Sequence, residues 1–72
     1  MNLSSINTNL LVALDLLLTH QSVQVAAEKQ YVTASAMSHS LRMLRDLFGD
    51  ELLTRTGGKM IRTPFGEQLM AP

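Results

Sequence analysis

The stretch from residue 22 to residue 47 constrains this chain most, because it has the pattern of two short helices separated by a tight turn. Ser22 is placed to cap a helix from Val23 to about Gln30, and Thr33 is placed to cap the next helix. Tyr31 and Val32, which lie between Gln30 and Thr33, make the turn. We therefore expect two closely connected helices rather than one long one.

The helix that follows Thr33 has two unlike faces. Apolar side chains recur on one face at helical spacing and are expected to face the core: Met37, Leu41, Leu44 and Phe48. The opposite face of its first two turns is small or polar and carries Ser35, Ser38, His39 and Arg42. A helix that enters the DNA major groove needs short side chains near its N-terminus, so that it can approach the base edges. The pattern therefore predicts a helix-turn-helix reader of double-stranded DNA, with residues 33–48 as the recognition helix.

Another helical pattern precedes this pair, and Asn7 or Thr8 can cap it. Its leucines form a wide stripe that is expected to face the core: Leu10, Leu11, Leu14, Leu17 and Leu18. Val12 and Leu16 lie on the opposite face. Two interpretations stay open for them: scattered surface residues, or a face on which a further helix or a second subunit packs.

The chain after the paired helices predicts a hairpin. Gly49 is placed to end the preceding helix, and Gly57 with Gly58 can take the positive φ angles that a hairpin turn needs. We expect the two strands within Glu51–Arg55 and Lys59–Thr63.

A last helix is expected to begin with Thr63 as its cap and Pro64 in its first turn. The expected fold is thus mainly α, a winged helix-turn-helix with a three-helix core and a two-stranded wing in residues 1–63. Residues 64–72 are expected to start a linker helix.

The net charge of zero counts against a nucleic-acid binder until the charges are placed along the chain. Residues 1–32 carry one Lys against two acidic residues, residues 33–63 carry five Lys and Arg against three acidic residues, and Glu67 follows. So few cations predict weak phosphate binding by one subunit, and therefore a homodimer.

Composition excludes several other classes. The 72 residues allow one domain, and the absence of cysteine excludes a disulfide framework and suits a reducing cytoplasm. The apolar run from Leu10 to Leu18 is too short to span a membrane and lacks the preceding cations of a signal peptide. His20 and His39 have no third ligand at suitable spacing, and Met60 stands where a phosphate loop needs Ser or Thr. We expect no metal, no cofactor and no enzymatic activity.

Short fragments occur along the chain in a characteristic order: Leu10-Leu11, Ser22-Val23, Ala26-Ala27, Val32 to Ser38, Leu41, Leu44-Arg45, Phe48 to Leu53, Arg55 to Gly57, and Thr63 to Gly66. With these, the chain resembles the N-terminal winged helix-turn-helix domain of LysR-type transcriptional regulators. The resemblance implies a cytoplasmic, nucleoid-associated bacterial transcription factor that reads an interrupted inverted repeat as a dimer through its linker helix. It also implies an effector-sensing domain after this chain, so that the sequence reads as an isolated DNA-binding domain or a truncated product.

Four positions depart from the family pattern. Ala34 stands where Gln is frequent, so that it can touch a thymine methyl but donates no hydrogen bond. His39 stands where Arg is frequent, and Gly58 where a wing Arg is common, with Lys59 beside it as a substitute charge. Gln30 replaces a core Leu, and we expect it to be half-exposed or bonded to nearby backbone, with Tyr31 covering the gap.

The predicted DNA-binding residues are Ser22, Thr33, Ala34, Ser35, Ser38, His39, Arg42, Arg55, Lys59 and Arg62. Each has a plainer alternative: Ser22 and Thr33 are helix caps first, the polar face of the recognition helix can be an ordinary solvated face, and the wing cations can serve solubility. Arg45 at the edge of that face can be a surface ion pair. The alternative function is a winged-helix interaction module that binds another protein and no specific DNA.

Overall fold

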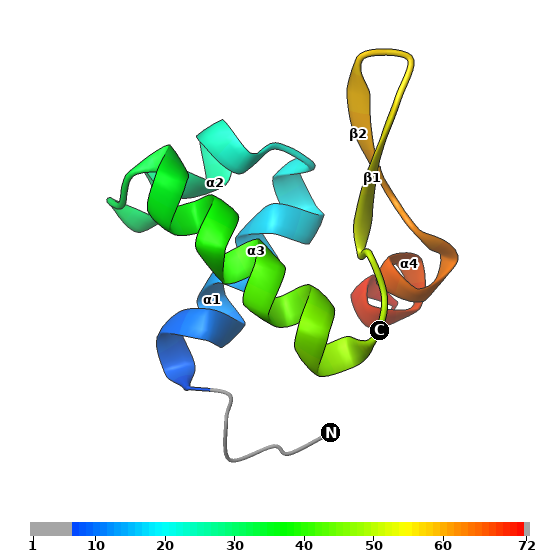
Figure 1. The fold of residues 1–72 in the computed structure, drawn as a ribbon, viewed down its shortest axis with the longest axis horizontal. Coiled ribbons are helices and arrows are strands. Elements are labelled where there is room, and N and C mark those ends of the chain that lie inside the picture. The colour runs from blue at the N-terminus through cyan, green and yellow to red at the C-terminus, as the bar shows by residue number, and fades with distance from the viewer. Residues whose placement is uncertain (1–6, 72) are drawn as a thin grey trace.

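Three packed helices, a β-hairpin and a fourth helix make up the computed structural model, which describes residues 7–71 (Figure 1). The elements are α1 (Thr8–His20), α2 (Val23–Gln30), α3 (Ala34–Phe48), β1 (Leu53–Thr56), β2 (Lys59–Arg62) and α4 (Pro64–Met70). Helices α1, α2 and α3 contact one another, and the hairpin projects from the end of α3 beside them. The expected winged helix-turn-helix fold is confirmed.

A side-chain cap starts each of the four helices. Asn7, Ser22, Thr33 and Thr63 each accept a hydrogen bond from the backbone amide three residues further on, at 2.8–3.1 Å. Each such cap stabilises its helix by about 1 kcal/mol because it satisfies an amide that has no partner inside the helix. The predicted starts of all four helices are therefore confirmed, with Asn7 rather than Thr8 as the cap of α1.

The core lies between the three N-terminal helices and the base of the hairpin. Its buried side chains are Leu10, Ala13, Leu17, Leu18, Ala26, Ala27, Met37, Leu41, Leu44, Leu52 and Leu53. Phe48 is half-buried rather than fully buried, and its ring centroid lies 5.8 Å from that of Phe65 on α4. The apolar face predicted for α3 is confirmed, with Phe48 turned toward α4.

The stripe predicted for α1 is wrong at Leu11, whose side chain is 51% exposed. Leu18, two turns further along α1, is buried because α4 packs beside it, where a Cβ at Gly66 would lie 3.3 Å from a Leu18 methyl carbon. Leu11 lies nearer the N-terminus of α1 and is left uncovered. On the opposite face Leu16 packs partly against the core, whereas Val12 stays exposed.

The polar Gln30 is satisfied across two helices. Gln30 is half-buried, and its Nε2 atom donates to the backbone carbonyl oxygen of Asn9 on α1 at 2.9 Å, as expected. The acceptor is close in space although it lies 21 positions away in the sequence. Tyr31 does not cover this place, because it ends α2 in a left-handed conformation (φ 59°) and its side chain is 95% exposed. The expectation that Tyr31 fills the gap is wrong.

The hairpin is shorter than expected on its first side. Strand β1 pairs antiparallel with β2, with Leu53 opposite Arg62 and Thr56 opposite Lys59, around a turn in which Gly57 and Gly58 have φ angles of 58° and 80°. The two residues expected to open the first strand, Glu51 and Leu52, lie before β1 because Leu52 has a φ of 67° and its backbone amide donates to the Asp50 carboxylate at 2.8 Å.

Helix α4 lies at the base of the hairpin, against α1 and β2 (Figure 1). The approach is close, because a Cβ at Gly66 would lie 2.8 Å from the carbonyl oxygen of Leu52. Within residues 7–71, each helix falls short of the length and apolarity that crossing a membrane requires. Helix α4 therefore packs where the hairpin joins the rest of the domain, and the Gly57–Gly58 turn lies at the far end of the hairpin.

Candidate nucleic-acid interface

The outward face of α3 is small and polar in its first two turns. Five residues predicted to read DNA are all exposed there: Ala34, Ser35, Ser38, His39 and Arg42. Met37, Leu41 and Leu44 on the opposite face are buried, so packing fixes which side of α3 is turned outward. The first turn of this face carries only methyl and hydroxymethyl side chains, which leaves its backbone accessible to a groove wall or a base edge.

A groove lies between the start of α2, the start of α3 and the hairpin. Its lining residues are Gln21, Ser22, Val23, Gln24, Ala34, Arg55, Gly58, Lys59 and Met60. The Ser22 hydroxyl satisfies one first-turn amide of α2, and the positive end of the α2 dipole lies in the groove wall. A helix N-terminus and two cationic residues of the hairpin thus line one space, which suits a phosphate group.

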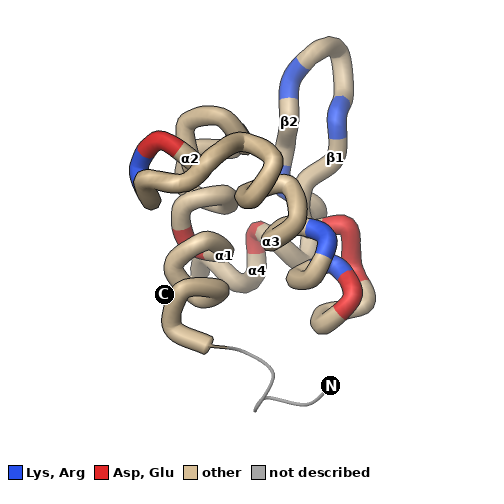
Figure 2. The backbone as a smooth tube through the Cα atoms, turned by 60° about the vertical axis from the view of Figure 1, so that its left-hand side comes forward, with Lys and Arg blue, Asp and Glu red and all other residues tan. Residues whose placement is uncertain are grey.

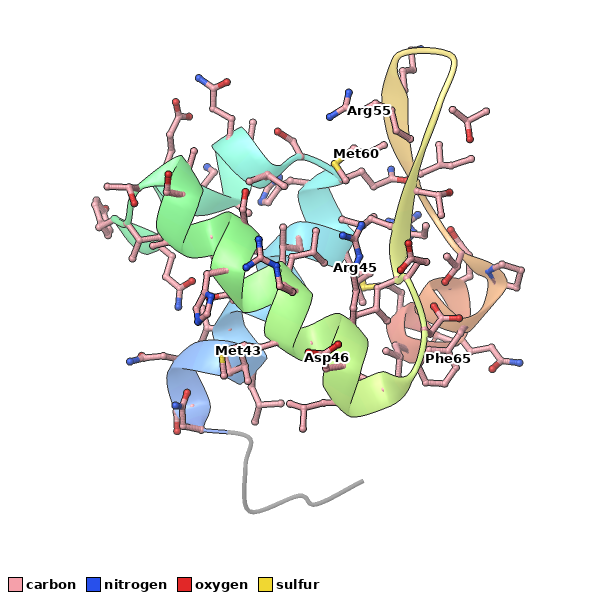
Figure 3. The ribbon with its side chains drawn as sticks, in the orientation of Figure 1. Met43, Arg45, Asp46, Arg55, Met60 and Phe65 are labelled. Carbon is pink, nitrogen blue, oxygen red and sulfur yellow. The ribbon has the colours of Figure 1, made fainter. Side chains whose placement is uncertain are left out.

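Arg55 and Lys59 supply the positive charge of the hairpin. They come from opposite strands next to the Gly57–Gly58 turn, and both are exposed. Figure 3 shows the Arg55 side chain reaching from the hairpin toward the side on which the helices lie. The groove wall is therefore positively charged on its hairpin side.

Acidic residues gather elsewhere. Asp46 is exposed near the C-terminal end of α3, far from the hairpin tip, and Asp50 and Glu51 follow in the loop (Figure 3). Figure 2 shows blue bands and no red band on the two arms of the hairpin, whereas blue and red bands lie next to each other on α2 and toward the end of α3. The zero net charge thus combines a hairpin that carries cations and no acidic residue with helices on which charges of both signs lie close together.

Two arginines that the sequence places near the interface are bound inward. Arg45 donates from Nε to the Glu51 carbonyl oxygen and from Nη2 to the Leu53 carbonyl oxygen, both at 2.8 Å. Its distance to the Glu51 carboxylate is 3.9 Å, so Arg45 binds backbone more closely than it pairs with an acid.

Arg62 lies at the base of the hairpin, and its side chain is only 22% exposed. Its Nη1 atom donates to the Leu18 carbonyl oxygen, and its Nε atom donates to Glu67 Oε1, each at 2.6 Å. Four of the ten predicted residues line the groove, Ser22, Ala34, Arg55 and Lys59. Ser35, Ser38, His39 and Arg42 are exposed on α3, and Thr33 caps that helix. Arg62 is held at the base of the hairpin by its contacts with Leu18 and Glu67.

Two further residues lie in the groove that the sequence analysis did not single out. Gln21 lines it from the junction of α1 and α2, where it takes a left-handed conformation (φ 51°), and Gln24 lines it from the first turn of α2. Their signal in the sequence is their position on either side of the Ser22 cap. In the described part of the chain, no three metal-ligating side chains come together.

The fold and this surface together define the class of winged helix-turn-helix DNA-binding domains. A family model described as bacterial regulatory helix-turn-helix protein, lysR family, matches residues 8–67. The chain belongs to this LysR family.

Individual relatives agree with this assignment. Nodulation protein D 1 of Bradyrhizobium sp. (strain NC92) is 43% identical over 72 residues, which is 100% of this chain and 23% of that protein. This chain therefore spans about a quarter of the length of that relative.

Two solved structures share the fold. A probable transcriptional regulator from Pseudomonas aeruginosa is 40% identical, with a TM-score of 0.84 over 93% of this chain and 22% of that one. Vibrio fischeri DarR in complex with DNA is 30% identical, with a TM-score of 0.80 over 96% of this chain and 23% of that one. Both are transcriptional regulators by description, and one of them is bound to DNA.

Proposed function

We propose that this chain binds double-stranded DNA sequence-specifically, as the DNA-binding domain of a LysR-type transcriptional regulator, with α3 in the major groove. The observation that carries the proposal is the exposed, small and polar face at the start of α3, next to a groove with positive charge on its far wall. The DNA-bound relative from Vibrio fischeri supports it, since that protein has the same fold.

The residues of α3 read the bases in this proposal. Arg42 is the longest donor on the face and suits a guanine or a phosphate, while Ser35, Ser38 and His39 contact base edges or backbone at closer range. Ala34 contacts a thymine methyl group, since it offers only a methyl group of its own.

The groove fixes the register on the DNA backbone. The amides that follow the caps Ser22 and Thr33 bind phosphate oxygens, in addition to their role in starting the helices. Arg55 and Lys59 add charge from the hairpin. Arg62 is left out of the contact set, because its guanidinium donates to Leu18 and Glu67.

The working unit is a homodimer on an interrupted inverted repeat. Two hairpin cations and Arg42 neutralise few phosphates, so one copy alone binds weakly. Residues 1–63 form the reading domain, and residues 64–72 begin the linker helix through which two copies associate, where Leu69 and Met70 are 38% and 37% exposed. An effector acts through the part of the protein beyond this chain, as the length of the relatives suggests.

Binding, and not catalysis, is the activity in this proposal, and its place is the bacterial cytoplasm at the nucleoid. The similar proteins named as regulators support the first point, since regulators of this fold act by occupying DNA. The second follows from the location of the DNA.

Selection from a random duplex pool tests the proposal directly. The chain is fused after Pro72 to a dimerising coiled coil and incubated with the pool at low salt, and a variant with Ser35, Ser38 and Arg42 replaced by Glu serves as the matched control. Enrichment of an interrupted inverted repeat by the parent chain alone is expected. Binding without any enriched sequence, lost at moderate salt in both proteins, would instead favour the protein-interaction module.

A further inference from the structure

The last residue of β2 joins three elements through one side chain. The Arg62 guanidinium donates to the Leu18 carbonyl oxygen in the last turn of α1 and to the Glu67 carboxylate in the first turn of α4. The carbonyl groups in the last turn of a helix have no partner inside the helix and favour a cation, so Leu18 is a strong acceptor for this arginine.

The backbone of Arg62 is fixed to the groove as well. Its amide donates to Gln21 Oε1 at 3.3 Å, and Gln21 both ends α1 and lines the groove below the hairpin. These contacts of Arg62 therefore fix the position of the end of β2 relative to α1 and to the groove.

Two arginine side chains tether the hairpin to the helices, and they differ in what they join. Arg45 ties the β1 side to α3, inside the helix-turn-helix unit. Arg62 ties the β2 side to α1 and, through Glu67, to α4. Since α4 leads toward the remainder of the longer relatives, the second tether can carry a change in α4 to the hairpin.

A small rotation at this base matters at the tip. The four residues of β1 span about 10 Å at about 3.3 Å per residue, so a tilt of about 10° moves the tip by about 2 Å. A shift of that size is enough to break a hydrogen bond or a close ion pair with a phosphate.

We propose that the Arg62–Glu67 pair is a positioning contact that couples the orientation of α4 to that of the hairpin, so that a shift of α4 changes how much Arg55 and Lys59 contribute to DNA binding. The inference rests on the proposed DNA-binding function. Glu67 is 58% exposed and the pair adds little stability as a surface ion pair, so its effect lies in the placement of the hairpin.

The test compares the loss of one hairpin contact, from Lys59, with the loss of one α3 contact, from Arg42. Each loss is measured in the parent chain and in the Glu67→Gln variant. Dissociation constants for the selected site are measured as a function of salt for the 72-residue chain with its coiled coil, with Lys59→Ala and Arg42→Ala each made in the parent and in Glu67→Gln. In the parent, Lys59→Ala should reduce the slope of log K against log salt by about 0.9, the value for one phosphate contact. In Glu67→Gln, Lys59→Ala should leave the slope unchanged, while Arg42→Ala should weaken binding by the same factor in both backgrounds.

Two further variants separate positioning from charge and from folding. Arg62→Lys keeps the charge but cannot donate to two acceptors with a rigid fork, so it should behave as Glu67→Gln does. Glu28→Gln removes an exposed carboxylate from α2 and should leave the Lys59 effect at its parental size. Circular dichroism is recorded for every variant, so that only folded proteins are compared.

The outcomes are distinct for the two proposals. An equal change of the salt slope by Lys59→Ala in the parent and in Glu67→Gln would overturn the coupling, while sequence-specific binding would stand. A Lys59→Ala variant with an unchanged slope in the parent would overturn the coupling as well. A parent chain that selects no sequence would overturn the proposed function itself.

Discussion

Thr63 and Asp50, thirteen residues apart, are joined by a hydrogen bond of 2.7 Å from the Thr63 hydroxyl to Asp50 Oδ2. The same hydroxyl accepts from the Gly66 amide to cap α4, and the same carboxylate oxygen accepts from the Leu52 amide. One side-chain pair therefore joins the segment before β1 to the segment between β2 and α4.

Replacing Asp50 with Ala should lower the free energy of unfolding by about 1–3 kcal/mol, because the Leu52 amide and the Thr63 hydroxyl lose their acceptor in a partly buried place. Urea unfolding followed by circular dichroism measures the change. Asp46→Ala is the matched control, since Asp46 is exposed on α3, and its effect should stay within about 0.5 kcal/mol. Equal effects of the two changes would show that the pair is not a stabilising contact.

Gly66→Ala should destabilise the domain by about 1–3 kcal/mol, although alanine favours helix, because the new Cβ would lie 2.8 Å from the backbone oxygen of Leu52. The thermal midpoint of unfolding is the measurement. Gln68→Ala, on the exposed side of α4, should leave that midpoint nearly unchanged. A Gly66→Ala variant at least as stable as the parent would mean that α4 is not held this close to the hairpin base.

Leu11 and Leu17 belong to one sequence pattern but should respond differently to truncation. Leu17→Ala should cost about 2–5 kcal/mol of unfolding free energy, since Leu17 is 1% exposed. Leu11→Ala should cost well under half of that, because about half of its side chain already meets solvent. The comparison is made by urea unfolding of the chain without the coiled coil, and a similar loss in both would indicate that a partner covers Leu11.

Arg42→Ala should weaken binding to the selected site by about 1–3 kcal/mol if the side chain reads a base, and it should leave unfolding unchanged because the residue is exposed. Fluorescence anisotropy with a labelled duplex gives the affinity. Thr19→Ala, on the exposed end of α1, controls for nonspecific effects of a surface change. Unchanged affinity of the Arg42 variant would make it an ordinary solvated residue.

Ala34→Gln should change which base is preferred rather than how stable the domain is. Glutamine can bond two edge atoms of an adenine, whereas the alanine methyl group contacts only a thymine methyl. Repeating the selection with this variant should shift one position of each half-site toward adenine at the contacted strand. An identical selected sequence would place Ala34 outside the reading distance of the bases.

Local patterns made most of this fold predictable, and long-range contacts account for what was missed. The caps Ser22 and Thr33 and the face of α3 follow from residues within one or two helical turns. The exposure of Leu11 depends on where α4 ends along α1, and the inward position of Arg62 depends on Leu18, 44 residues earlier.

The candidate site shows the same limit. Exposure of Ser35, Ser38, His39 and Arg42 follows from helical periodicity, and it was predicted correctly. Gln21 was missed because its place in the groove arises only when the hairpin folds back over the start of α2. A pattern within one helix contains no information about which distant segment comes to lie above it.

The hairpin from Leu53 to Arg62 carries cationic side chains and no acidic one, so positive charge is concentrated at one end of a domain whose net charge is zero (Figure 2). A polyanion exerts a torque on such a molecule even though the net force on a chain of zero charge is small. DNA would therefore turn the domain toward its reading face before contact while holding it weakly at random sequence. We therefore expect short residence at random sequence and a domain that is already oriented when it meets its site.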